Sequence, residues 1–167
     1  MNSLNKVAVL GGGSFGTVLA NLAASNGYNV SLWVRDSDQA LRINSEGANT
    51  SYHPELKLSE NIVASDNLNE VLENAEIIFI ATPSIVFENI VDRISEFIDP
   101  DSFIISCTKG ILEDPYRSLS EIISSKLNNK IGVLSGPNLA KEIAENKLAG
   151  TVIASSDEGL LIAVKSI

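Results

Sequence analysis

The sequence predicts an α/β fold, a doubly wound and mostly parallel sheet with helices on both faces. Short runs that are apolar almost throughout, as expected for strands covered on both faces, alternate along the chain with apolar stripes of helical spacing. A glycine-rich turn joins the first of these runs to the first stripe. Such alternation implies right-handed crossovers between parallel strands.

Seven apolar runs are expected to be the strands of this sheet: Lys6–Leu10, Val30–Val34, Ile62–Ala64, Ile77–Ala81, Phe103–Cys107, Ile131–Leu134 and Val152–Ala154. Three stripes predict helices, and their apolar residues are Phe15, Val18, Leu19, Leu22 and Ala23; Val86, Phe87, Ile90, Val91, Ile94 and Phe97; and Leu119, Ile122, Ile123 and Leu127. A fourth and weaker stripe comprises Ala140, Ile143, Ala144 and Leu148.

Two segments depart from this rhythm. The segment Asn44–Glu60, rich in Asn, Ser, Gly and Pro, predicts an irregular connection over the edge of the sheet where a ligand would bind. The final segment, Asp157–Ile167, begins a helical pattern and contains no capping residue or breaker to end it. We therefore expect residues 1–167 to form one domain, the N-terminal part of a longer protein.

Length and composition limit the class of protein. A chain of 167 residues suits a single domain, and its net charge of −9 argues against nucleic-acid binding, because phosphate contacts need clustered Lys and Arg. No apolar run approaches the roughly 20 residues that span a bilayer, and the apolar start is too short for a secretory signal. The lone cysteine, Cys107, cannot form an internal disulfide. We therefore expect a cytoplasmic domain, without a transmembrane segment, a nucleic-acid partner or a metal site.

The strongest local signal is the glycine turn Gly11-Gly12-Gly13-Ser14-Phe15-Gly16, which fits G-x-G-x-x-G between a predicted strand and a predicted helix. In a Rossmann-type dinucleotide site, Gly11 would allow the tight turn, Gly13 would let the backbone approach a pyrophosphate, and Gly16 would permit close packing of helix on strand. The helix N-terminus would offer free N–H groups to the anion. We predict dinucleotide binding here; the alternative is a glycine-rich loop without a ligand.

The next predicted strand ends at an arginine. Arg35 stands where an NAD-preferring site would carry an Asp or Glu for the ribose hydroxyls, and Asp36 follows it. A guanidinium offers a planar fork of donors that suits a 2′-phosphate. The sequence therefore favours NADP, or tolerance of both NADP and NAD; the alternative is a surface arginine after a strand.

Further loops follow other predicted strands, at the edge where ligands collect in open α/β sheets. The loop Thr82-Pro83-Ser84 is interpreted as a turn with Ser84 as N-cap of the next helix. Lys109 comes directly after a buried strand and before Gly110, where folding does not require a lysine, and an ammonium is useful facing a phosphate or a reacting oxygen.

The loop Ser135-Gly136-Pro137-Asn138 follows the next strand in the same manner. Gly136 would let a ligand come close, and Asn138 would cap the following helix while pointing at the site. A plain helix-capping turn explains the spacing equally well.

Together these motifs resemble the N-terminal domain of the bacterial NAD(P)-dependent glycerol-3-phosphate dehydrogenases. The resemblance covers essentially the whole chain, in the segments LGGGSFGTVLA, LWVRD, ATPS, CTKGI, SGPNLAKEIA and TVIAS, of which CTKG and SGPNLAKE are the most specific. It implies an oxidoreductase that interconverts dihydroxyacetone phosphate and sn-glycerol 3-phosphate with NADH or NADPH, supplying the phospholipid backbone. It allows a homodimer in the full-length enzyme.

Carried over residue by residue, the resemblance implies that Ser14 and Phe15 contact the pyrophosphate region of the cofactor, Arg35 its adenosine end and Ala140 its nicotinamide side. His53, the only histidine, lies in a loop near where some family members touch the cofactor. The alternative for His53 is a solvated loop residue.

On the substrate side, the resemblance implies that Lys109 lies between cofactor and substrate, and that Gly136 and Asn138 contact the glycerol phosphate. Asn138 replaces a more frequent serine. The family's general acid/base lysine and most of its phosphate clamp belong to a C-terminal helical substrate domain that we expect to be absent from this chain. Alone, the chain should bind nucleotide and turn over little or nothing.

Two alternative functions stay open. One is the nucleotide-binding domain of another NADP oxidoreductase, of the 6-phosphogluconate or ketopantoate type, which CTKG and SGPNLAKE disfavour. The other is a non-catalytic NAD(P)-binding module that senses redox state.

Overall fold

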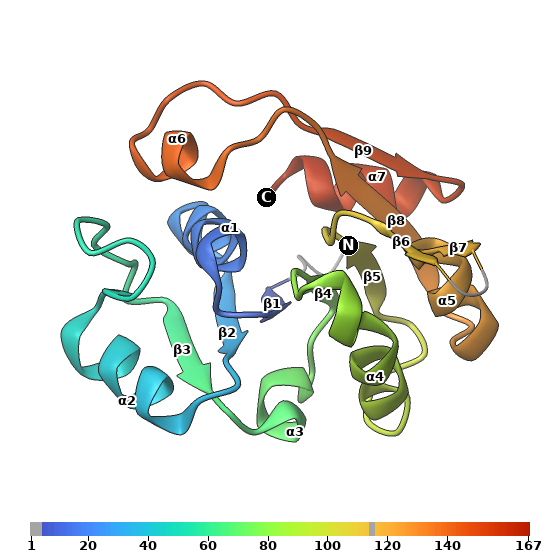
Figure 1. Cartoon of the computed structure of the whole chain (residues 1–167), viewed down its shortest axis with the longest axis horizontal. Coiled ribbons are helices and arrows are strands. Elements are labelled where there is room, and N and C mark those ends of the chain that lie inside the picture. Colours follow the sequence, from blue (N-terminus) through green and yellow to red (C-terminus); the bar gives the residue numbers. More distant parts are fainter. Residues whose placement is uncertain (1–4, 114–115) are drawn as a thin grey trace.

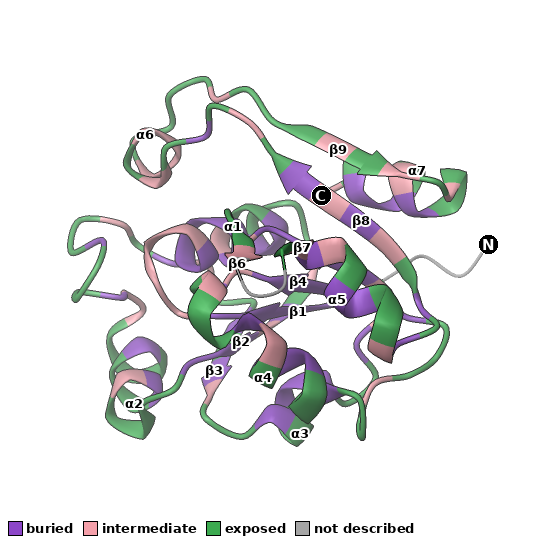
Figure 2. Ribbon diagram, turned by 45° about the vertical axis from the view of Figure 1, so that its right-hand side comes forward, coloured by how far each residue is buried: buried purple, intermediate pink, exposed green. Residues whose placement is uncertain are grey.

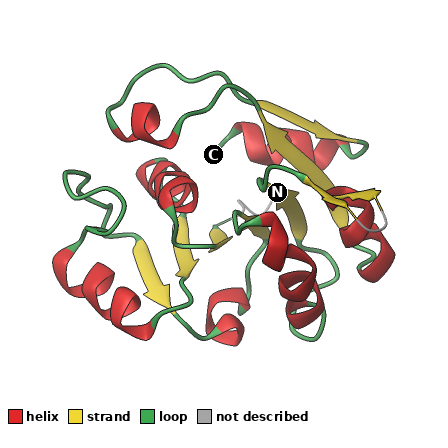
Figure 3. Cartoon of the chain, viewed as in Figure 1, coloured by secondary structure: helices red, strands yellow, loops and turns green. Residues whose placement is uncertain are grey.

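A seven-stranded sheet crosses the protein, in a computed structural model that describes residues 5–113 and 116–167 (Figures 1 and 3). Its strands lie in the order β3-β2-β1-β4-β5-β8-β9, and every neighbouring pair is parallel except β8 and β9. Their bounds are β1 (Lys6–Leu10), β2 (Asn29–Trp33), β3 (Ile62–Ser65), β4 (Ile77–Ile80), β5 (Phe103–Ser106), β8 (Lys130–Ser135) and β9 (Val152–Ser155). Each of the seven predicted strands is in this sheet, which confirms the predicted fold class.

Helices cover both faces of the sheet. One face packs against α1 (Ser14–Ser25), α2 (Ser37–Glu46) and α7 (Glu158–Lys165). The other packs against α3 (Leu68–Leu72), α4 (Ser84–Ile94) and α5 (Leu119–Lys126). A small antiparallel hairpin of β6 (Ile111–Glu113) and β7 (Tyr116–Ser118), absent from the sequence prediction, lies outside the sheet between β5 and α5.

Side-chain alternation along the strands makes the two cores. Val7 and Val9 of β1 belong to the core under α1, whereas Ala8 and Leu10 belong to the core under α4. The four residues of β4 have no exposed surface, and Figure 2 shows β1 and β4 buried along most of their length. Burying one such side chain contributes about 1.5–3 kcal/mol, which explains why β4 is apolar at every position.

The weakest predicted helix packs differently from expectation. The helix α6 (Ala140–Ala144) has five residues, none of them buried, and Leu148 of the predicted stripe is fully exposed. In Figure 1 this helix lies beside α1 and away from the sheet, in the segment that connects β8 to β9. The expected stripe therefore forms no part of the cores.

The final helix begins where the sequence indicates. The Asp157 carboxylate accepts the N–H of Leu160 (2.8 Å) and caps α7, which ends at Lys165. No helix among the described residues has the length and apolar character that crossing a bilayer requires.

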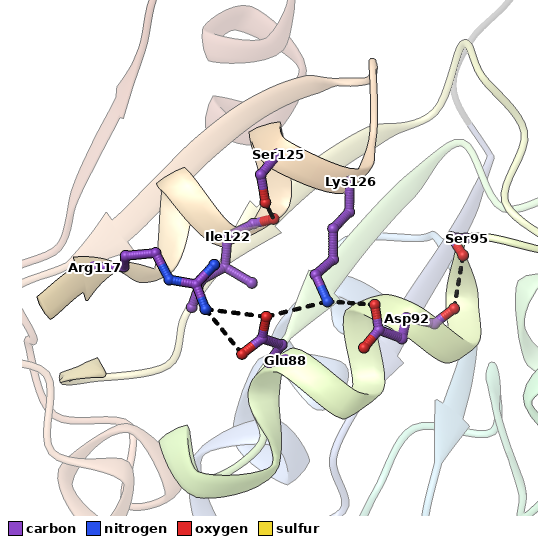
Figure 4. Close-up of polar contacts among 7 residues, drawn as sticks. All are labelled: Glu88, Asp92, Ser95, Arg117, Ile122, Ser125 and Lys126. Carbon is purple, nitrogen blue, oxygen red and sulfur yellow. Dashed lines mark hydrogen bonds and ion pairs between the residues drawn. The ribbon is translucent and has the colours of Figure 1, made fainter. Parts of the chain in front are cut away.

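An ion-pair cluster ties α4 to α5 and to β7 on the outer surface (Figure 4). The Glu88 carboxylate accepts two hydrogen bonds from Arg117 Nη2 (3.1 Å each) and lies 3.1 Å from Lys126 Nζ, which also contacts Asp92. Hydrogen bonds from Lys126 and then Arg117 lower the pKa of Glu88. The cluster joins elements on the outside of the second core, away from the carboxyl ends of the strands.

Candidate functional site

The order in which the chain adds strands to the sheet reverses between the neighbouring strands β1 and β4. From β1 the chain adds β2 and β3 on one side, and from β4 it adds β5 and β8 on the other. In open α/β sheets ligands bind at such a switch point, beyond the carboxyl ends of the strands. A cleft of about 950 Å³ opens there, lined by the turns that follow β1, β2, β4 and β5.

The glycines of the first turn have separate roles in this geometry. Gly11 has a φ of +125°, and a Cβ on it would lie 2.6 Å from the Ala81 carbonyl oxygen. A Cβ on Gly16 would lie 1.8 Å from the Gly11 carbonyl oxygen, so folding itself requires both glycines. A Cβ on Gly13 would meet nothing within 4 Å among the described residues. The turn thus leaves open space at Gly13, on the lining of the cleft.

The N-terminus of α1 opens into the same space. Gly13 is its N-cap and no described side chain caps it, so the first N–H groups of the helix are available to an anion. Ser14 and Phe15, the next two residues, also line the cleft. The open space at Gly13, the free N–H groups and the dipole of α1 therefore all favour an anion at this position.

The irregular segment between α2 and β3 packs onto this turn. Asn49 Nδ2 donates to the Gly12 carbonyl oxygen (3.0 Å) and to Thr17 Oγ1 (2.8 Å), and Gln39 Nε2 donates to the same Gly12 oxygen (2.7 Å). His53 is buried, with Nε2 2.9 Å from Ser14 Oγ. The irregular connection is thus confirmed over residues 47–60, whereas residues 44–46 of the predicted segment belong to α2. The alternative of a solvated His53 is wrong. Sequence reasoning missed Asn49 and Gln39, because nothing in their local pattern shows a contact with a distant carbonyl.

Positive charge gathers on the cleft although the chain is acidic. Its charged lining residues are Arg35, Arg42, Arg93, Lys109 and Asp36. The single carboxylate among them is engaged, since Asp36 Oδ1 accepts the N–H groups of residues 38 (2.8 Å) and 39 (3.1 Å) and caps α2. The arrangement favours a ligand with several negative charges.

The turn after β5 presents an exposed lysine. Thr108 Oγ1 donates to the Thr82 carbonyl oxygen (2.7 Å) and fixes this turn against the turn after β4. Lys109 lies next to that anchor, exposed on the cleft. Cys107, also on the lining, is buried, and burial raises its thiol pKa far above the usual range, so this thiol is no nucleophile.

Two capping predictions are wrong. Pro83, not Ser84, is the N-cap of α4, because Ser84 already begins the helix. Leu139, not Asn138, is the N-cap of α6. The Asn138 side chain is buried instead, and its Nδ2 donates to Thr151 Oγ1 (3.4 Å).

Burial leaves two polar atoms on the cleft lining without partners. Thr82 Oγ1 and Asn138 Oδ1 accept or donate no hydrogen bond within the described part of the chain. An unpaired buried polar atom costs about 1–3 kcal/mol, so each of these atoms gains from a polar partner. A polar ligand in this end of the cleft would supply such partners.

The predicted site residues mostly converge. Those on the cleft lining are Gly11, Gly13, Ser14, Phe15, Arg35, Lys109, Asn138 and Ala140. Gly16 packs beneath the turn, and Gly136 is not among the lining residues; its φ is +144° and a Cβ on it would lie 2.6 Å from the Gly150 carbonyl oxygen. A folding reason therefore suffices for Gly136, and its contact with a substrate stays a prediction.

Comparison with known proteins gives one consistent result. Residues 6–161 match the family model described as NAD-dependent glycerol-3-phosphate dehydrogenase N-terminus. The chain is 46% identical over 157 residues to a glycerol-3-phosphate dehydrogenase (NAD(P)+) of Alcanivorax borkumensis, covering 93% of this chain and 46% of that protein. A homologous protein of Teredinibacter turnerae is 40% identical over 167 residues, covering 99% of this chain and 49% of that protein.

A solved structure agrees with these sequence matches. The crystal structure of glycerol-3-phosphate dehydrogenase from Coxiella burnetii superimposes with a TM-score of 0.91 at 33% identity, covering 96% of this chain and 49% of that one. The chain therefore spans about half the length of the curated relatives it matches.

Proposed function

The chain belongs to the family of NAD-dependent glycerol-3-phosphate dehydrogenase N-termini, and from this we propose that it is the cofactor-binding domain of such an enzyme, taking NADP or NAD. The whole enzyme would reduce dihydroxyacetone phosphate to sn-glycerol 3-phosphate, for lipid synthesis. One observation carries the proposal. The glycine turn leaves space at Gly13 in front of a helix N-terminus that no side chain of the described residues caps, where the order of strand addition reverses.

The lining residues fit the parts of a dinucleotide. The pyrophosphate would lie over Gly13 and take the N–H groups of Ser14 and Phe15 at the start of α1. Arg35, after β2, would hold the adenosine end. Ala140, across the cleft, would face the nicotinamide side.

On the substrate side, the nicotinamide would supply the hydride, and this chain would supply charge and hydrogen bonds. The Lys109 ammonium would lie between cofactor and substrate, where it would hold a substrate oxygen or phosphate and polarise the carbonyl. Thr82 Oγ1 and Asn138 Oδ1 would gain the partners that they lack. Gly136 would contact the glycerol phosphate through its main chain.

Other groups of the reaction lie outside these residues. We propose that a helical C-terminal domain provides the general acid/base lysine and most of the phosphate clamp, which accords with a chain that spans about half the length of its relatives. A homodimer and a cytoplasmic location also belong to this proposal. The family match does not favour the 6-phosphogluconate or ketopantoate alternative.

Direct binding tests the cofactor assignment. Trp33 is the only tryptophan and lies on the cleft, so its fluorescence reports on this site alone. Titration of the chain with NADPH or NADH should quench it saturably. Binding of neither nucleotide, by fluorescence or by calorimetry, would overturn the proposal.

The reaction itself needs the full-length protein. It should oxidise NADPH or NADH only when dihydroxyacetone phosphate is added, and Lys109→Ala should lower that rate at least about 100-fold while leaving nucleotide binding measurable. An undiminished rate would remove Lys109 from the mechanism. Nucleotide binding without any turnover would favour the redox-sensing alternative.

A further inference from the structure

We propose that Arg93 is a second specificity residue for the 2′-phosphate of NADP, acting with Arg35 at the adenosine end of the cleft. The inference rests on the proposed function and deepens it, because it names which of the two cofactors this site selects and by which further residue.

Arg93 reaches the cleft from a separate part of the fold. It lies in the last turn of α4, whereas Arg35 follows β2 and Arg42 belongs to α2. All three line the same cleft, together with the end of β2. Three guanidiniums from separate parts of the chain thus line one cleft.

The indole of Trp33 holds Arg93 there. The guanidinium carbon lies 5.5 Å from the centroid of the Trp33 ring, which is a cation–π contact. Trp33 Nε1 donates to the Asp66 carbonyl oxygen (3.0 Å), and the ring is buried, so the surface under the guanidinium is fixed. Since Trp33 is the last residue of β2, it stands two positions before Arg35. Stacking uses the face of a guanidinium and leaves its N–H edge free for a phosphate.

Arg93 is in none of the ion pairs found among the described residues. The ion pairs of the described residues include none with Arg35, Arg42 or Arg93, whereas Arg117 lies 3.1 Å from a Glu88 oxygen. The chain has 21 acidic residues against 12 basic ones, so three arginines on one cleft without ion-pair partners among the described residues are unexpected for a solvated surface. A phosphate monoester, with about −1.5 to −2 charges, supplies the missing counter-charge.

Two simpler roles for Arg93 make different predictions. A cation in the last turn of a helix stabilises the helix through its dipole. A guanidinium stacked on the adenine would bind both cofactors equally, because NADP and NAD share that ring. Only a contact with the 2′-phosphate separates the two nucleotides.

The test compares four ligands by calorimetry, because a change at Arg93 also alters the fluorescence of Trp33. The wild-type chain and Arg93→Gln are titrated with NADPH, NADH, adenosine 2′,5′-bisphosphate and adenosine 5′-monophosphate. We expect Arg93→Gln to weaken NADPH and the bisphosphate about tenfold or more, the size of one charge-assisted contact, and to change NADH and the monophosphate less than about twofold.

Matched variants keep the result interpretable. Arg93→Lys retains the charge without the fork and should lose less affinity for NADPH than Arg93→Gln. Arg117→Gln removes an arginine outside the cleft and should leave all four affinities unchanged. Thermal unfolding shows that each variant is folded; Arg93 is exposed, so its replacement leaves both cores intact.

The outcomes separate this inference from the proposed function. Wild-type binding of NADPH, with an equal loss for both cofactors or with no loss in Arg93→Gln, overturns the role of Arg93 alone. A wild-type chain that binds none of the four ligands overturns the proposed function and this inference with it.

Discussion

His53 Nε2 lies 2.9 Å from Ser14 Oγ and 3.0 Å from the Ser14 carbonyl oxygen, although 39 positions separate the two residues. A carbonyl oxygen only accepts, so the tautomer with hydrogen on Nε2 serves it. Ser14 is the first residue of α1 and lines the cleft. His53 therefore fixes the main chain at the helix N-terminus and leaves the Ser14 hydroxyl hydrogen free to face a ligand.

The first prediction tests this positioning role. His53→Leu removes these hydrogen bonds at similar side-chain volume. We expect it to lower the free energy of unfolding by about 1 kcal/mol and to weaken NADPH binding about 3- to 10-fold. The double variant with Ser14→Ala completes a mutant cycle of calorimetric dissociation constants. Because Ser14→Ala removes the Oγ contact and leaves the contact of His53 with the Ser14 carbonyl oxygen, the two losses should add only in part. Wild-type NADPH affinity in a folded His53→Leu chain would contradict a positioning role for His53.

The second prediction separates folding from binding within the glycine turn. Gly13 has ordinary backbone angles (φ −81°, ψ −171°) and free space at its Cβ, so Gly13→Ala should unfold at the wild-type temperature. The added methyl would occupy the approach of the pyrophosphate and should weaken both NADPH and NADH at least about tenfold.

Gly16→Ala is the contrasting variant. Its Cβ would lie 1.8 Å from the Gly11 carbonyl oxygen, so we expect a large loss of stability, about 2 kcal/mol or more, in chemical denaturation. Unchanged nucleotide binding in a folded Gly13→Ala chain would show that no ligand passes over this turn.

The third prediction concerns cofactor choice at Arg35. Reversing its charge in Arg35→Glu places a carboxylate beside the expected 2′-phosphate, and the same carboxylate is able to accept hydrogen bonds from ribose hydroxyls. Affinity for NADPH should therefore fall far more than affinity for NADH, by about 100-fold against a few-fold. Calorimetric titration of both nucleotides measures the split. Equal effects on the two would defeat the assignment of Arg35 to the adenosine end.

The central sheet was predictable because burial on both faces leaves little choice of residue. Every position of β4 is fully buried, and the run Ile77–Ile80 shows this directly. The helix α2 was missed because it buries only Ala40 and Ile43, too few for a stripe. The hairpin of β6 and β7 has strands of three residues, too short for any alternation to stand out.

The site was predictable where a motif sets the backbone and unpredictable where side chains meet across the fold. The glycine turn and Lys109 follow strands, and topology alone brings them to one edge. The hydrogen bond that the Gly12 carbonyl oxygen accepts comes from Asn49, 37 positions away, and the local sequence does not predict that contact. The position of Arg93 likewise depends on the Trp33 ring beneath it, a contact that the local sequence does not show.

The last prediction uses pH to isolate the outer ion-pair cluster. Hydrogen bonds from Lys126 and Arg117 lower the pKa of Glu88 below its ordinary 4.5, so folding favours the ionised carboxylate (Figure 4). The stabilisation of the folded state by ionised Glu88 is then complete at pH values above the ordinary pKa. It is lost as the pH falls through the lowered pKa of the folded state. Glu88→Gln should lower the urea midpoint at pH 7, and its difference from wild type should shrink in acid.

Urea unfolding at a series of pH values measures that difference, with Glu60→Gln, a change on an exposed loop, as the control that leaves the midpoint unchanged at neutral pH. Salt should reduce the effect at pH 7, because the cluster lies at the surface and its charges are screened. Nucleotide affinity should stay the same in Glu88→Gln, since neither Glu88 nor its partners line the cleft. A midpoint difference that persists undiminished in acid would assign Glu88 a packing role, and the electrostatic explanation of the link between α4 and α5 would be wrong.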